Sequence, residues 1–118
     1  MRLVTFVASG DEQRLGVLVD DDATVIDLQS ANIAAHGNAR PELASVLALI
    51  EAGEDAVKFA RSLQEHASAR TRLRRTEVKL RAPIQPPPQM RDCLTFELHL
   101  RQCFDSARNC FRPDFVSV

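Results

Sequence analysis

The sequence lacks three features that would each assign a protein to a class: an excess of charge of one sign, a long apolar segment, and closely spaced cysteines. Its 15 basic and 16 acidic side chains give a formal net charge of -1, so global charge attracts it to neither nucleic acid nor an anionic membrane. No apolar run approaches the roughly 18 residues of a membrane span. No charged-then-apolar leader opens the chain. We therefore expect a cytoplasmic protein with no membrane partner.

The cysteines are few and unpaired in sequence. Cys93, Cys103 and Cys110 are an odd number, and none has the two-residue gap typical of structural zinc sites. We expect reduced thiols without a part in chemistry. His99 and Cys103 can share one helical face at i and i+4, which is a possible metal pair. A third and a fourth ligand are not apparent, so the sequence argues against a zinc site.

What is present suits one small globular domain. The 118 residues are 45% hydrophobic and 26% charged, which is ordinary for such a domain. Between Met1 and Leu28, short β-rich runs alternate with turn residues and predict three strands joined by tight turns. Asp20, Asp21 and Asp22 are expected at a solvated hairpin tip. They lack the downstream glycine and glutamate of an EF-hand calcium loop.

Helices are predicted to follow. A capped helical turn is expected to begin residues 27–36. Apolar spacing of i, i+3, i+4 and i+7 then predicts a short helix that ends at Gly53 and buries Leu43, Val46, Leu47 and Ile50. A second helix is expected to start near Glu54 and to bury Ala56, Phe59, Ala60 and Leu63. These two helices should pack as a hairpin on the sheet.

One basic cluster follows, formed by Arg70, Arg72, Arg74 and Arg75. It could bind nucleic acid, but no aromatic residue is interleaved with the arginines to stack on a base. A solvated loop and strand edge is the preferred interpretation, because basic side chains on an edge strand discourage pairing with other chains. We therefore expect no nucleic-acid partner.

The predicted fold class is α+β. Residues 1–82 should form a small antiparallel sheet packed by the helical hairpin. Residues 83–91 should form a Pro-rich linker, since Pro83, Pro86, Pro87 and Pro88 limit its freedom. Residues 92–118 should contain a terminal helix.

The stretch from Pro86 to Arg101 contains the candidate catalytic and metal-binding residues. In it, Arg91-Asp92 is followed by Phe96-Glu97 and by His99-Leu100. This pattern resembles the long, two-part members of the fumarylacetoacetate hydrolase family. Four earlier segments resemble the N-terminal domain of that family in the same order: residues 1–6, 14–19, 25–28 and 49–54.

The resemblance implies an enzyme that hydrolyses a carbon–carbon bond in a β-diketone or a related oxo-acid. Such a reaction needs a divalent cation, Mg²⁺, Mn²⁺ or Ca²⁺, to stabilise the enolate that leaves. The resemblance makes Asp92 a ligand of that metal and His99 the base that takes a proton from the attacking water. An imidazole suits this role because its ordinary pKa, about 6.5, lies near working pH.

The resemblance also has gaps. The family's other metal ligands, a Glu-x-Glu pair and an aspartate, belong to a larger downstream domain, so residues 92–118 would be the truncated start of a catalytic domain. We expect this chain alone to bind the cation weakly and to be inactive, and the complete protein to be a homo-oligomer such as a homodimer. Without the resemblance, Asp92 would be a helix cap and His99 a half-buried helix residue. The alternative function is a non-catalytic interaction or assembly module that uses residues 104–118.

Overall fold

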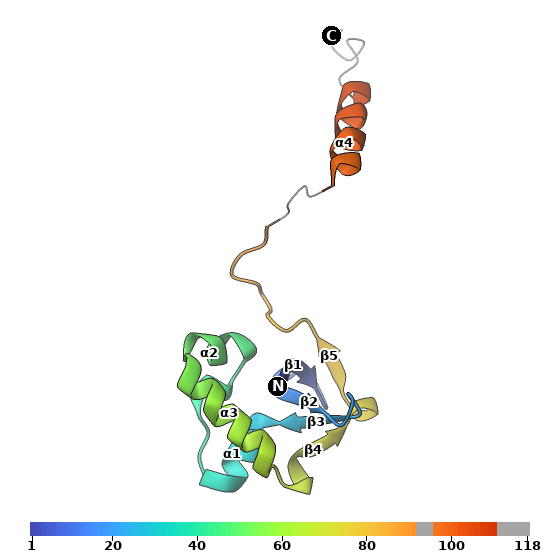
Figure 1. Cartoon of the computed structure of the whole chain (residues 1–118). Coiled ribbons are helices and arrows are strands. Elements are labelled where there is room, and N and C mark those ends of the chain that lie inside the picture. Colours follow the sequence, from blue (N-terminus) through green and yellow to red (C-terminus); the bar gives the residue numbers. More distant parts are fainter. Residues whose placement is uncertain (92–95, 111–118) are drawn as a thin grey trace. The chain divides into compact units, whose positions relative to one another are not determined.

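The computed structural model of the chain describes residues 1–91 and 96–110, except for the side chains of residues 108–110. The chain divides into two compact units, Met1–Pro86 and Pro87–Val118. The first unit contains a five-stranded sheet and helices α1 to α3, and the described part of the second contains helix α4 (Figure 1). The fold is α+β, as the sequence predicts.

The sheet is antiparallel, with the strand order β4-β3-β2-β1-β5. Its strands are β1 (Arg2–Val7), β2 (Arg14–Val19), β3 (Thr24–Asp27), β4 (Arg72–Arg74) and β5 (Lys79–Arg81). The first three form the predicted meander. The two edge strands are joined by a short 3-10 turn, η3 (Arg75–Glu77), and by Val78, so a connection of only four residues links opposite edges of the sheet. The sheet must therefore curl.

The β2–β3 connection is the predicted hairpin tip. Asp20, Asp21 and Asp22 all have positive φ angles, of 54°, 50° and 71°, and the Ala23 amide donates to the Asp20 carbonyl at 3.0 Å. Arg2 forms an ion pair with Asp22. The aspartates thus form a left-handed turn, a conformation that this residue type tolerates better than most.

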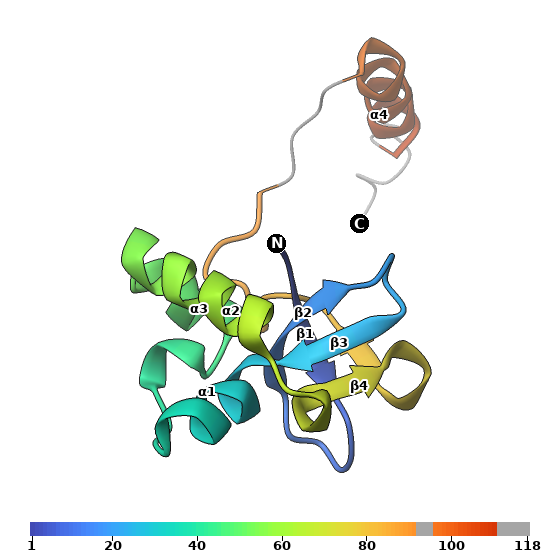
Figure 2. The same ribbon diagram turned by 60° about the horizontal axis from the view of Figure 1, so that its bottom comes forward.

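Local capping signals explain where the helices begin and end. Helix α1 (Leu28–His36) starts at Asp27, whose side chain accepts a hydrogen bond from the Ser30 amide, and ends at Gly37 with φ 76°. Helix α3 (Glu54–His66) follows Gly53, whose φ of 86° permits the sharp turn from α2. Figures 1 and 2 show α1, α2 and α3 together on one side of the sheet.

Helix α2 (Val46–Glu51) confirms part of the predicted buried set: Leu43 and Val46 are buried and Leu47 is half-buried, but Ile50 is not buried. Ile50 is 54% exposed, whereas Leu49 is fully buried. The reason is that Ser45 caps the helix, while Leu43 belongs to a separate 3-10 turn, η1 (Pro41–Leu43). The two segments do not share one helical register, so the i, i+3, i+4, i+7 pattern counted from Leu43 was wrong at its last position, Ile50.

The core lies on both faces of the sheet. The larger cluster joins the sheet to the helices and contains Leu15, Val17, Leu28, Leu43, Val46, Leu49, Ala60 and Leu63. The smaller cluster, on the opposite face, contains Phe6, Val25 and Val78. Gly16 lies beneath this second cluster, where a Cβ atom would be only 2.8 Å from Val25 Cγ1 and 2.9 Å from the Phe6 ring.

The start of the expected linker is attached to the first unit. Thr5 Oγ1 donates to the Pro83 carbonyl at 2.7 Å, and Ile84 packs against the larger core cluster. The division between the two units falls between Pro86 and Pro87, inside the 83–91 segment. Helix α4 (Glu97–Cys110) lies where a terminal helix is predicted. Among the described residues, no helix is long and apolar enough to cross a membrane.

Candidate functional site

Helix α4 carries His99, the predicted base. Both His99 and Cys103 are exposed, one helical turn apart, and the Cys103 Sγ lies 3.7 Å from the His99 Nε2. An imidazole and a thiol at this distance can share a proton or bind the same cation. The structure therefore brings together the pair that the sequence places at i and i+4.

The predicted metal ligand, Asp92, lies outside the described residues. Within residues 1–91 and 96–110, no three histidine, cysteine, aspartate or glutamate side chains form a group that could hold a metal ion. A single carboxylate is a suitable but incomplete ligand for Mg²⁺, Mn²⁺ or Ca²⁺, which bind about six or more oxygens.

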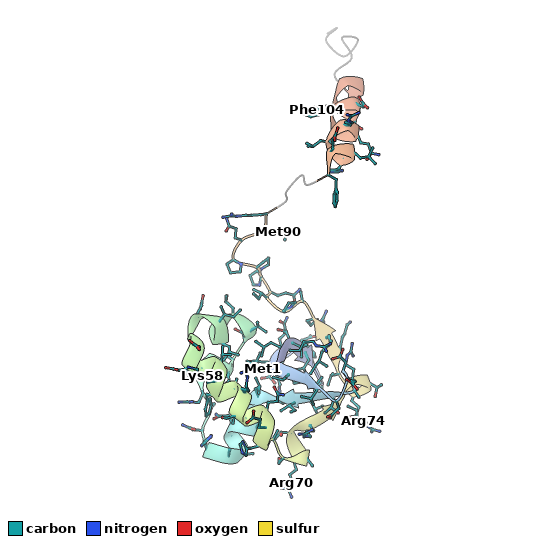
Figure 3. The ribbon with its side chains drawn as sticks, in the orientation of Figure 1. Met1, Lys58, Arg70, Arg74, Met90 and Phe104 are labelled. Carbon is teal, nitrogen blue, oxygen red and sulfur yellow. The ribbon has the colours of Figure 1, made fainter. Side chains whose placement is uncertain are left out.

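Helix α4 also presents apolar side chains to solvent. Phe96, just before its first turn, is 73% exposed, and Phe104 is 65% exposed (Figure 3). With 100° per residue, Phe96, Leu100 and Phe104 fall on one face, and His99 and Cys103 border it. On the other side, Arg101 Nη2 pairs with Glu97 Oε1 at 2.6 Å. The helix is thus amphipathic, with the His–Cys pair beside its apolar face.

A polar cluster in the first unit centres on Arg14. Its guanidinium lies 2.7 Å from Glu12 Oε2 and 3.3 Å from Asp27 Oδ2. The hydrogen bond from Arg14 to Glu12, followed by the one to the buried Asp27, raises the pKa of Arg14 above its ordinary value. Sequence reasoning identified Asp27 as part of a helix cap but missed this cluster, because it depends on the pairing of β2 with β3.

Two hollows flank Arg14. One is about 250 Å³ and mainly apolar, with α2 and the start of the linker among its walls: Thr5, Gln13, Arg14, Ala44, Ser45, Leu47, Pro83, Ile84, Gln85 and Pro86. The other is more polar, and Asp27, Gln29 and Ser30 contribute to its lining. In both, the charge of Arg14 is already compensated by its two carboxylate partners, so neither hollow presents a free cation to a substrate.

The basic cluster lies at the sheet edge, as the preferred interpretation predicts. Arg72 Nη1 is 3.5 Å from Asp20 Oδ2, and Arg74 is paired with Glu77. Figure 3 shows Arg70 and Arg74 on the outside of the first unit. Acid partners for two of the four arginines reduce the net positive charge available to a phosphate backbone.

No protein-family model and no curated protein sequence matches the chain. A functional assignment therefore depends on the residues of the 86–101 stretch and on the properties of the described site.

Proposed function

We propose that this chain is the N-terminal domain and linker of a fumarylacetoacetate hydrolase-like enzyme, in which Asp92 binds a divalent cation and His99 is the general base. The observation that carries the proposal is the order of residues from Arg91 to Leu100 directly after a Pro-rich run. The substrate class is a β-diketone or oxo-acid, and the complete protein is a homo-oligomer.

Two structural features support this proposal. A small α+β unit ends at Pro86, immediately before the stretch that carries Asp92 and His99. The His99 side chain is exposed on α4, so its imidazole is accessible to water and substrate. An accessible imidazole can take a proton from an attacking water, and such a base increases rates by roughly a hundred- to ten-thousand-fold.

A divalent cation would supply Lewis acidity at the carbonyl oxygens of the substrate. The part of this chain in that chemistry is limited. Asp92 provides one anionic oxygen, and His99 accepts the proton of the water. Cation affinity depends on ligand number and charge, so we expect binding to this chain to be weak and turnover to be absent.

Weak binding can be tested with Mn²⁺ as a paramagnetic probe in NMR spectra. We expect millimolar Mn²⁺ to broaden the ring resonances of His99 more than those of His36 and His66, because only His99 is close in sequence to Asp92. The broadening should disappear in Asp92→Ala and persist in Cys103→Ala. The second variant separates a carboxylate site from binding to the thiol.

Two results would overturn the assignment of Asp92. One is the absence of selective broadening at His99, and the other is equal broadening in the wild type and in Asp92→Ala. In the complete protein, the matching test is oxo-acid cleavage with Mg²⁺. Both Asp92→Ala and His99→Ala should reduce kcat/KM, the latter by roughly a hundred-fold or more.

Assembly is a second candidate function. The exposed Phe96 and Phe104 favour it, because burying them against another surface removes apolar area from water. Light scattering on the metal-free chain at increasing concentration tests this role. A mass that stays monomeric throughout would contradict association through the apolar face alone.

A further inference from the structure

We propose that His99 and Cys103 form one half of a zinc site, and that the same two residues of a second copy of this chain complete it. This site shares His99 with the proposed hydrolase function, but it uses a thiol as its second ligand and needs neither Asp92 nor a substrate. It also assigns a role to Cys103, for which the hydrolase proposal has none.

The distance between the two ligand atoms suits a shared tetrahedral ion. With a Zn–S distance of about 2.3 Å and a Zn–N distance of about 2.0–2.1 Å, tetrahedral angles separate sulfur and nitrogen by about 3.6 Å. The observed separation of Cys103 Sγ from His99 Nε2 is 3.7 Å. The pair can thus bind one ion with little rearrangement of its helix.

The chemistry of the pair selects the metal. A thiolate and an imidazole favour zinc over Mg²⁺ or Ca²⁺, which prefer oxygen ligands. Only the thiolate binds, so each Cys103 releases its proton when zinc enters, and apparent affinity rises with pH. His99 binds as the neutral imidazole through Nε2.

A second copy of the chain supplies the two zinc ligands that one chain lacks. Structural zinc takes four protein ligands, while the described residues contain no group of three candidate ligands in reach of one ion. A two-fold axis through the ion would repeat the His–Cys pair and complete the set. The exposed Phe96 lies beside Cys103 on the helix surface, so the same axis would bring the Phe96 rings of the two helices toward one another. The charged pair Glu97–Arg101 lies on the helix side that faces away from His99 and Cys103, so it does not oppose a contact centred on the ion.

Cobalt spectroscopy on the full chain tests the ligands. Under a non-thiol reductant, we expect Co²⁺ to produce a thiolate-to-cobalt charge-transfer band and the visible absorption of a tetrahedral ion, and Zn²⁺ to abolish both. Cys103→Ala should lose the charge-transfer band, and His99→Ala should lose the tetrahedral signature. His66→Ala is the matched control and should keep both. A Cys93→Ser/Cys110→Ser variant should also keep both.

Light scattering with metal titration tests the second copy. At a concentration where the metal-free chain is monomeric, Zn²⁺ should double the mass at one ion per two chains. This doubling should be absent in Cys103→Ala and unchanged in Asp92→Ala. The last variant separates this site from the proposed hydrolase site, because it removes the Mn²⁺ effect at His99 and leaves the zinc effect intact.

Three results would overturn the proposal. The charge-transfer band could persist in Cys103→Ala, which would place the metal on another cysteine. The wild type could show no band with Co²⁺. Zinc could bind at one ion per chain without a change of mass, which would refute completion by a second copy. Both side chains are exposed, so their replacement leaves the core of the first unit unaffected.

Discussion

Asp21 has a backbone conformation that its side chain does not favour. It is exposed, its φ is 50°, and it makes no ion pair with the described residues. Glycine adopts this left-handed conformation without the steric cost of a Cβ atom, which is roughly 1–2 kcal/mol for L-residues in general and less for aspartate. We predict that Asp21→Gly raises the free energy of unfolding by about 1 kcal/mol, measured by urea denaturation. Asp11→Gly, at an exposed residue without a positive φ, is the control, and a lower stability of Asp21→Gly would contradict the prediction.

Asp27 connects a helix end to a strand. Its Oδ1 accepts from the Ser30 amide at 3.0 Å, and its Oδ2 accepts from Ser30 Oγ at 2.8 Å and from Arg14 Nη1 at 3.3 Å. We predict that Asp27→Ala lowers the free energy of unfolding by about 1–2 kcal/mol through the loss of the cap. Asp27→Asn should lose less, because its amide oxygen can still accept from Ser30. Equal losses in the two variants would argue that charge pairing with Arg14, rather than capping, stabilises this corner.

At the scale of elements, β2 can pass beneath the smaller core cluster only because residue 16 has no side chain. An added Cβ would lie 2.8 Å from Val25 Cγ1 and 2.9 Å from the Phe6 ring. We predict that Gly16→Ala lowers the free energy of unfolding by about 1–3 kcal/mol through overpacking. The double variant Gly16→Ala/Phe6→Leu should lose less free energy of unfolding than the sum of the losses in the two single variants, because the smaller leucine side chain leaves space for the added methyl group. If the two substitutions changed the free energy of unfolding additively, residue 16 and Phe6 would not clash in Gly16→Ala.

The stability that the β4–β5 connection contributes should decrease at acidic pH. Hydrogen bonds from the Arg74 side chain, and then from its backbone amide, lower the pKa of Glu77 below its ordinary value. A pKa that is lower in the folded chain contributes stability above the unfolded pKa, and this contribution is lost as pH falls through the folded pKa. We predict that Glu77→Gln is less stable than the wild type at neutral pH, and that the difference shrinks below about pH 4.3. Urea denaturation across pH measures this difference, and Glu65→Gln, at an exposed residue of helix α3, is the matched control.

Capping and composition made most elements predictable. The Asp27 cap, the turn at Gly53 and the Asp20–Asp22 hairpin tip are local features, and the structure confirms each of them. The burial of Leu49 in place of Ile50 on α2 was not predictable in this way. The register of α2 depends on Ser45 starting a new helix after the η1 turn, and a periodic pattern counted across that break cannot detect it.

At the scale of the whole molecule, the boundary after Pro86 predicts independent folding of the first unit. The core clusters, with Ile84 packed against one of them, lie within residues 1–86. We predict that a chain ending at Pro86 unfolds with the same thermal midpoint as the whole chain. Brief proteolysis of the whole chain should cut first beyond Pro86 and leave a stable fragment, since exposed connections are preferred cleavage sites. A clearly lower midpoint would show that residues after Pro86 stabilise the sheet domain.

The sequence by itself determined the α+β class, the three-strand meander, two of the helix starts and the basic sheet edge, because strands, caps and turns depend on short-range chemistry. Only the tertiary structure decided the placement of β4 and β5 on opposite edges of one sheet, the space requirement at Gly16 and the Arg14 cluster. These features join residues far apart in the chain, and no local pattern specifies such pairings. Within α4 the sequence placed His99 and Cys103 on one face, and the structure added the 3.7 Å distance between Cys103 Sγ and His99 Nε2, which suits the proposed zinc site.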